Sequence, residues 1–488
     1  MSGVIRLEKF GKPGIFVVTD NFGHDAKSSA DDNGMPTIRI VTVPAQEFYK
    51  RRISREEVKP VAVGAINAMI DALTHPLTQE EAKPKPKQIK MSRTIKITAA
   101  SYELAVEKFN QSFLDNHWGD GLPLIPPTPK RVKWMLTGTG RSPQEVIGTV
   151  APKNGTATIE KIAINAVMAG AKPEYLPVII AAMEGLTDKK FDLLHVMTSS
   201  GSFNLLIMVN GPIAKEINMN SGIGFLGHGW RANNTIGRAV RLSLVNLGYL
   251  WPAENDMALI GRPSSHTFNT FAENEENSPW EPYHVSLGYK KEDSCVTVST
   301  VGSYEGGMTI YGGGAVALWS ARSILEQIIK DISSDRKMFA LFKRGVANPA
   351  AHPRKHIIML HPECAIELQR LGYTRESLQK YLYERTSVPY EELSPEEVRA
   401  IQERIEGSVA GGMILSDIIP QNRITVFKET LKPGGKVPVV ISPEEIHIIV
   451  AGGIPGYTFG ISYIKAPYAP TSNQIKLIRG ATLTKAGR

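Results

Sequence analysis

The chain has 488 residues, of which 42% are hydrophobic and 21% are charged. This ordinary globular composition excludes a chain that is disordered throughout. Lysine and arginine (56) outnumber aspartate and glutamate (48), which gives a formal net charge of +8. Part of the excess lies in residues 83–96, where no aromatic side chain accompanies the basic ones. We therefore expect a solvated linker there and no nucleic-acid partner.

Two cysteines, Cys295 and Cys364, lie far apart in the sequence. This number excludes a disulfide framework and favours a reducing compartment. The first residues lack the apolar core of a signal peptide, and no window approaches the roughly 18 apolar residues that a membrane helix needs. We expect a cytoplasmic protein without a membrane partner.

Residues 1–77 contain two β-branched runs, at 14–19 and 37–43, separated by a polar, helix-compatible stretch at 24–32, and continue with a helical pattern over 54–73. The helical pattern opens with Ser-Arg-Glu-Glu, which is typical of a capping box. Strand and helix signals that alternate in this way predict a β-α-β-α unit of a parallel sheet. Because so small a unit leaves a sheet with open edges, we interpret residues 1–77 as a partial α/β domain. The Lys- and Pro-rich residues 78–93 predict an extended linker.

The remaining chain is predicted to form a larger α/β body, with a mixed α+β arrangement as the alternative. We assign residues 94–345 to a central ligand-binding domain and 346–488 to a C-terminal α/β region packed on it. Periodicity predicts central helices at 99–116, 159–169, 174–186, 231–248 and 315–332, and a strand at 205–209. In the C-terminal region it predicts strands at 356–360 and 445–450 and helices at 364–371, 375–385 and 395–405.

Residues 231–248 place three arginines on one side of the predicted helix, and apolar residues occupy the other side. Arg231, Arg238 and Arg241 share the polar side with Asn234 and Thr235. A solvated basic face is one reading. The other is an anion site, because glycines 222, 224, 227 and 229 precede a helix start that combines free amides with Arg231. The same glycines match a dinucleotide fingerprint only weakly, since no strand leads directly into them.

The second informative segment is residues 271–280, which carry Glu273, Glu275 and Glu276 beside Asn274. Three neighbouring carboxylates repel one another unless they spread in solvent, meet arginines or bind a cation. If the acidic segment faced the arginine helix, the carboxylates and the arginines would neutralise each other. We therefore predict that Asp120, Arg231, Arg238, Glu273 and Glu276 converge in one pocket, where a carboxylate with a shifted pKa transfers protons. A hydrated loop is the alternative.

Further candidates come from loops. The Pro-rich residues 117–129 predict a rigid loop that holds Trp118 and Asp120. His228 could be a general base or a hydrogen-bonded structural residue. No spacing suits a structural zinc, and we expect neither a metal site nor a cofactor. The candidate catalytic residues are Asp120, His228, Glu273 and Glu276, and the candidate substrate-binding residues are Trp118, Asn220, Ser221, Arg231, Asn234, Arg238, Asn274 and Trp280.

Three segments, HWGDGLPLIPPT at 117–128, NSG…GHGWRANNTIGRAVRLSLVNLG at 220–248 and FAENEENSPWEPYHV at 271–285, carry a family resemblance. They resemble uncharacterised bacterial proteins associated with the UGSC-type (seleno)protein family, named for a Sec-Gly-Ser-Cys or Cys-Gly-Ser-Cys motif. The resemblance covers most of residues 95–488, and the N-terminal segment is similar to the part that follows the motif. It implies thiol or selenol redox chemistry. The motif itself is absent from this chain.

Two functions are therefore expected. The first is a thiol- or selenol-dependent oxidoreductase or reductive-cleavage enzyme, or its substrate-binding part, acting on a small anionic molecule. Its selenocysteine or cysteine motif would then lie upstream of Met1. The alternative is a non-catalytic ligand-binding or assembly subunit that completes a site on a partner subunit bearing the motif. Either would form a homo- or hetero-oligomer.

Overall fold

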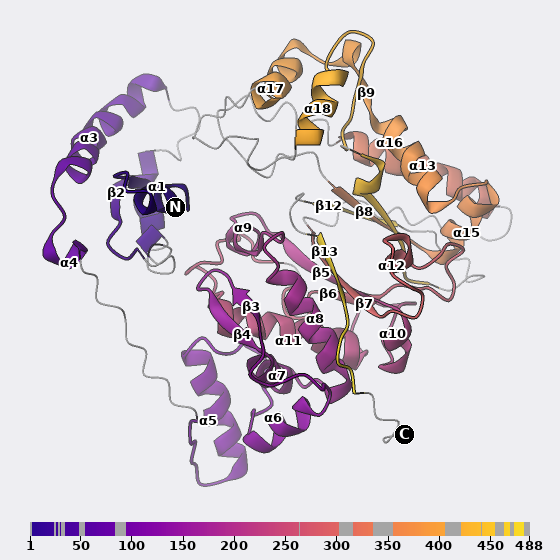
Figure 1. Cartoon of the computed structure of the whole chain (residues 1–488), viewed down its shortest axis with the longest axis horizontal. Coiled ribbons are helices and arrows are strands. Elements are labelled where there is room, and N and C mark those ends of the chain that lie inside the picture. Colours follow the sequence, from indigo (N-terminus) through magenta and orange to yellow (C-terminus); the bar gives the residue numbers. More distant parts are fainter. Residues whose placement is uncertain are drawn as a thin grey trace.

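The computed structural model describes residues 2–23, 26–27, 30, 35–47, 54–82, 94–262, 264–301, 316–334, 355–405, 421–440, 442–453, 463–468 and 473–482. These residues form an α/β fold with several small sheets, none of them closed (Figure 1). Most of the predicted linker, residues 83–93, lies outside the described residues. No helix among the described residues has both the length and the apolar character needed to cross a bilayer.

The N-terminal module holds two parallel strands, β1 and β2, paired from Ile15 with Arg39 onwards. Helix α3 packs on both strands and begins with the predicted capping box, in which Ser54 and Glu57 satisfy each other's backbone amides. Apolar side chains of α3, including Val63 and Ile70, nevertheless stay exposed. The elements of the module are α1 (Ser2–Lys9), β1 (Ile15–Thr19), η1 (Asp20–Phe22), β2 (Arg39–Val43), η2 (Ala45–Glu47), α3 (Arg55–Thr74) and α4 (Gln79–Ala82).

The central domain is built on a four-stranded sheet of order β13-β7-β5-β6, in which β5 and β6 are parallel and β7 is antiparallel to β5. The sheet strands are β5 (Asn204–Asn210), β6 (Asn269–Ala272), β7 (Cys295–Val301) and β13 (Asn473–Leu477). A hairpin of β3 (Val146–Val150) and β4 (Gly155–Thr158) lies apart from it. Strand β13 is the last described strand of the chain. It pairs with β7 and therefore belongs to the central sheet and not to the sheet of the C-terminal region.

Three helices, α7 (Ile159–Met168), α8 (Leu176–Leu186) and α11 (Arg231–Gly248), pack together beside this sheet, with α8 against β7 and β13 and α11 against β6 (Figure 1). Their apolar residues form the largest core of the described chain. Shorter elements complete the domain: α5 (Tyr102–Asp115), α6 (Pro129–Leu136), η3 (Pro173–Tyr175), α9 (Leu193–Thr198), α10 (Pro212–Glu216) and α12 (Tyr283–Ser286).

The C-terminal domain has a three-stranded sheet of order β11-β8-β12 with β8 and β11 parallel. Helix α13 (Val316–Ser334) packs against α15 (Pro362–Arg370) and α16 (Arg375–Thr386) and shares their core. The other elements are β8 (Lys355–Leu360), β9 (Val388–Pro389), η6 (Tyr390–Glu392), α17 (Pro395–Ile405), α18 (Gln421–Thr430), β10 (Lys436–Val437), η8 (Pro443–Glu445), β11 (Ile446–Val450) and β12 (Tyr463–Tyr468).

The central and C-terminal domains meet through an apolar layer from both sheets, including Met208 and Phe271 on one side and Met359 and Ile449 on the other. Beyond the carboxyl ends of β6 and β11, segments of the two domains are also joined by backbone hydrogen bonds. The amide of Asn274 donates to Val450 O (2.8 Å), and the amide of Gly452 donates to Ser221 O (2.7 Å). The carboxyl ends of parallel strands are where α/β proteins commonly bind ligands, so both predicted site segments lie in a favourable part of the fold.

Candidate functional site

Helix α11 starts at Arg231, as its residue pattern predicts. Trp230 is the N-cap residue in an extended conformation, and its side chain makes no capping hydrogen bond. Further along, a Cβ on Gly237 would lie 1.6 Å from Thr267 O, so only glycine allows this close approach of the helix to the segment before β6. The helix is therefore fixed against the sheet, and its first amides have no side-chain cap.

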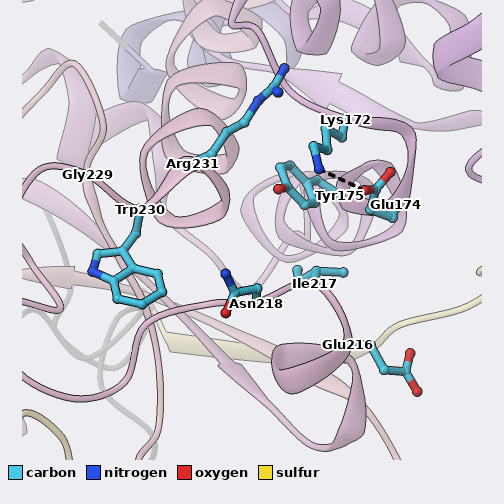
Figure 2. Close-up of a pocket in the computed structure, with 9 residues that line it drawn as sticks. All are labelled: Lys172, Glu174, Tyr175, Glu216, Ile217, Asn218, Gly229, Trp230 and Arg231. Carbon is cyan, nitrogen blue, oxygen red and sulfur yellow. Dashed lines mark ion pairs between the residues drawn. The ribbon is translucent and has the colours of Figure 1, made fainter. Parts of the chain in front are cut away.

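An open pocket of about 560 Å³ lies at this helix start. We call it the α11 pocket. In Figure 2, Trp230, Tyr175 and Asn218 surround its space, and Arg231 rises from the helix beside it. The helix supplies Trp230 and Arg231, while the turn of η3 and the end of α10 supply the opposite wall. Its lining residues are Lys172, Glu174, Tyr175, Glu216, Ile217, Asn218, Gly229, Trp230 and Arg231.

Arg231 is held in place by the backbone. Its Nε and Nη2 atoms donate to Gly170 O at 3.1 and 2.9 Å. Within the described part of the chain it has no carboxylate partner, which leaves its positive charge unmatched by the protein. Burial raises the pKa of the neighbouring Tyr175 hydroxyl, with Glu174 adding to the rise and Arg231 opposing it. Tyr175 therefore stays protonated at neutral pH and can donate a hydrogen bond.

Arg238 and Asp120, two members of the predicted shared pocket, do contact each other. Their side chains form a bidentate pair with distances of 2.8 and 2.9 Å, and Arg238 also donates to the carbonyls of Leu122 and Pro123. Asp120 thus neutralises the charge of this arginine, and the carbonyls of the Pro-rich loop accept further hydrogen bonds from it. The pair anchors the loop to α11, and neither member lines the α11 pocket.

Arg241 fits neither reading of the arginine side of α11, which was expected to be a solvated basic face or an anion site. It is buried, with Asp256 Oδ2 3.8 Å from its Nη2 atom. Burial lowers its pKa, and Asp256 opposes the shift. Arg262, which bonds Asp256 directly at 2.9 Å, shares that carboxylate. The helical wheel places Arg241 on the polar side, but this residue is buried and lies beside Asp256 from the loop that follows α11.

Glu273 also lies elsewhere than predicted. It follows β6 in the interior, where its Oε1 accepts from Arg375 Nη2 (3.1 Å) of α16. Its Oε2 accepts from Asn210 Nδ2 (2.5 Å) and from the amide of Tyr283 (2.6 Å). Burial raises the pKa of Glu273 to about 7, against the lowering effects of Arg375 and these hydrogen bonds. Its arginine partner comes from the C-terminal domain and not from α11.

Other residues of 271–283 also bond to the C-terminal domain. Asn274 Nδ2 donates to the carbonyls of Gly452 and Gly453 at 3.3 Å, and Trp280 Nε1 donates to Tyr373 O at 3.0 Å. The Tyr283 hydroxyl lies 2.8 Å from His447 Nδ1. We call these contacts, together with Glu273 and Arg375, the domain junction. The acidic segment that was predicted to hold a ligand thus contacts the C-terminal domain at the domain junction.

The remaining predicted residues are dispersed. Glu276 is exposed, 3.9 Å from Lys215, and Glu275 accepts from Asn210 (2.9 Å) and from the amide of Gly211 (2.8 Å). Asn220 is buried and supports the glycine loop through Ile223 O. The carbonyl of Ser221 accepts from the amide of Gly452, and the side chain of Asn234 donates to Trp230 O. His228 is exposed in the glycine loop, and Trp118 packs edge-on against Phe113.

Sequence reasoning missed Lys172, Tyr175 and Asn218 in the α11 pocket and Arg375 in the domain junction. Lys172 and Tyr175 flank η3, whose Pro173 could have indicated a fixed turn. Asn218 adopts a left-handed conformation with φ of 57°, which asparagine tolerates well, but its contact with α11 is tertiary. Arg375 follows the N-cap Thr374 at a helix start and gave no local signal of its partner.

Both cysteines of the chain are buried. Burial raises the pKa of Cys295 to about 12, with Asp293 and Glu275 adding to the effect. Burial likewise raises the pKa of Cys364 to about 12, and Glu367 adds to it. A thiol attacks as a thiolate, so neither cysteine is suited to be a nucleophile at neutral pH.

Among the described residues, no group of three or more His, Cys, Asp or Glu side chains is arranged to hold a metal ion. Comparisons with protein-family models, with curated proteins and with solved structures find no match to this chain. The chemistry of the α11 pocket and of the domain junction is therefore the basis on which a function can be inferred.

Proposed function

We propose that the chain binds a small anionic molecule in the α11 pocket. The observation that carries this proposal is the unmatched charge of Arg231, which lines an open pocket at a helix start without a side-chain cap. A carboxylate or phosphate there would meet the guanidinium together with the positive end of the α11 dipole. The two arginines further along α11 have acidic neighbours within the protein and offer no such site.

The pocket supports binding of a small organic anion. Trp230, 37% exposed, offers an indole face to an apolar part of the ligand, and Ile217 provides a buried apolar wall. Within the described residues the Tyr175 hydroxyl and the Asn218 side-chain amide make no hydrogen bond, so both are available to polar groups of the ligand. Arg231 is already oriented by Gly170 O, so binding would cost little side-chain entropy.

The burial of both cysteines favours the ligand-binding role over a self-sufficient redox enzyme. A thiol or selenol step, which the family resemblance implies, would need a nucleophile other than Cys295 or Cys364. We propose that a partner subunit bearing the motif supplies it, and that this chain holds the substrate. Glu273 would then stabilise the junction between the domains and would not contact the ligand.

Isothermal titration calorimetry of the full chain with acetate, succinate and inorganic phosphate at low ionic strength tests the binding proposal. We expect at least one of them to bind, and Arg231→Lys to weaken it roughly tenfold, because an ammonium lacks the bidentate fork of guanidinium. Arg131→Lys is the matched control, since Arg131 also donates to a backbone carbonyl, Pro126 O, but lies outside the pocket. Equal affinities of the wild type and Arg231→Lys for every probe, or no binding at all, would contradict the proposal.

A further inference from the structure

Helix α3 of the N-terminal module has two apolar faces. One packs on β1 and β2, and Ala65 is buried. The other is a row of large aliphatic side chains that remain between 42 and 61% exposed. Figure 1 shows α3 on the outer side of the module, with β1 and β2 on its inner side. We call the exposed row the α3 stripe; its members are Val63, Ile66, Ile70, Leu73 and, directly after the helix, Leu77.

The spacing of the α3 stripe indicates what can cover it. Its members follow one another at three, four, three and four positions. This strict seven-residue repeat keeps apolar side chains on one narrow line, and it is the spacing with which two helices interlock. A helix that lies on a lipid surface has a polar face rich in lysine and arginine, whereas Asp71 is the one charged residue within residues 60–74. The α3 stripe therefore fits another helix.

The stripe is also complementary to itself. If two copies of α3 lie antiparallel and centred on residue 68, Val63 of one copy is opposite Leu73 of the other, and Ile66 is opposite Ile70. The opposed helix dipoles favour this arrangement. The four positions that flank the stripe carry no charge, so identical helices can pair without repulsion between like charges. These flanking residues are Ala62, Asn67, Met69 and Thr74.

We propose that two copies of this chain form a dimer through their α3 stripes. The stripe side chains of two copies together expose roughly 900 Å², and the flanking residues raise the area to about 1,000–1,200 Å², the lower end for a specific interface. We therefore expect a dissociation constant in the micromolar range. The dimer goes beyond the proposed function and does not depend on it, since no residue of α3 lines the α11 pocket.

Sedimentation equilibrium of the full chain between about 1 and 100 µM tests the proposal. We expect the wild type to dimerise and Ile70→Asp to weaken the dimer at least about tenfold, because each dimer would bury two unpaired carboxylates. Leu104→Asp is the matched control. Leu104 is 56% exposed on helix α5, outside the stripe, so its replacement should leave the association unchanged. Circular dichroism checks that both variants keep their helical content.

A variant that strengthens the dimer separates a lost interface from a lost fold. Lys59 is exposed and lies four positions before Val63, on the line of the stripe. Lys59→Leu should lengthen the stripe by one turn and tighten the dimer about fivefold. Lys133→Leu adds the same apolar side chain to the exposed surface of α6 and should have no effect.

Three results would overturn the proposal. A wild-type chain that stays monomeric over the whole range would mean that something other than a second copy covers the stripe. A dimer that Ile70→Asp leaves intact would form through another surface. Equal effects of the stripe variants and their controls would show unspecific apolar association. Anion binding in the α11 pocket is measured separately, and none of these results bears on it.

Discussion

The α11 pocket and the domain junction each contain charged residues that the sequence predicts to be functional. At the junction these charges are paired within the protein, whereas in the pocket Arg231 has no carboxylate partner among the described residues. At the junction Glu273 is 4% exposed and accepts hydrogen bonds from Arg375, Asn210 and Tyr283. In the pocket Arg231 is exposed, and within the described chain its guanidinium donates only to a backbone carbonyl, Gly170 O. A dense group of charged residues in the sequence can thus indicate either a contact between domains or a candidate ligand-binding site.

The difference shows that the partner of a charge is more informative than the charge itself. Buried ions are tolerated when other protein groups pair with them, as Arg375 pairs with Glu273. An ion that keeps an unmatched charge at a pocket is available to a ligand. By this criterion the start of α11 is a better candidate for a binding site than the acidic segment 271–280, whose Glu273 is paired inside the protein.

The largest expected effect on stability follows from removing the Glu273–Arg375 pair at the domain junction. At pH 8, Arg375→Met should destabilise the full chain by about 3–5 kcal/mol, because an ionised Glu273 would be left without its cation. The carbonyls of Ile448 and Glu281, which accept from Arg375, would also lose their donor. Urea unfolding measures the loss. At pH 5 it should be smaller, since Glu273 can then be protonated.

Arg385→Met is the matched control for this variant. Arg385 lies on the same helix, α16, at the surface, with its guanidinium 5.6 Å from the Tyr381 ring centre. We expect a loss of about 1 kcal/mol or less. Similar losses for the two variants at pH 8 would show that the buried pair does not hold the domain junction.

The second effect concerns pH. Burial raises the pKa of Glu273 from 4.5 to about 7 in the folded chain, so the unfolded chain releases this proton first as pH rises. Between about pH 4.5 and 7 the unfolded state therefore binds fewer protons, and stability falls by up to about 3 kcal/mol. Glu273→Gln should lack this contribution. The difference in stability between variant and wild type, followed by urea unfolding across this range, should change in favour of the variant. A constant difference would contradict the raised pKa.

Much of the local structure could be predicted because its signals are local. The capping box at Ser54, the start of α11 at Arg231 and the buried strand β5 all follow from short-range patterns. Periodicity over 159–169 and 174–186 likewise predicted helices α7 and α8. The α/β class follows from the alternation of such elements.

The partners of the charged residues could not be predicted, because they depend on contacts between distant segments. Glu273 meets Arg375, which is 102 positions away in sequence. Strand β6 has only four residues, too few for a pattern, so Phe271 and Ala272 looked like the beginning of a loop when they are the end of a buried strand. The position of Arg241 was wrongly predicted for the same reason, since a helical wheel cannot show that Arg241 is buried beside Asp256 from the loop after α11.

The smallest expected effect comes from one substitution made at two places on the same helix. Arg238→Lys should cost about 1–2 kcal/mol of stability, because an ammonium cannot replace the bidentate contact with Asp120 or serve the carbonyls of Leu122 and Pro123 as well. Arg231→Lys should change stability by about 0.5 kcal/mol or less, since Arg231 is exposed and has only Gly170 O as a partner. Urea unfolding and calorimetry on both variants should give opposite rankings: Arg238→Lys the less stable, Arg231→Lys the weaker binder. If the same variant were both the less stable and the weaker binder, the two arginines of α11 could not be divided into one that stabilises the fold and one that binds the ligand.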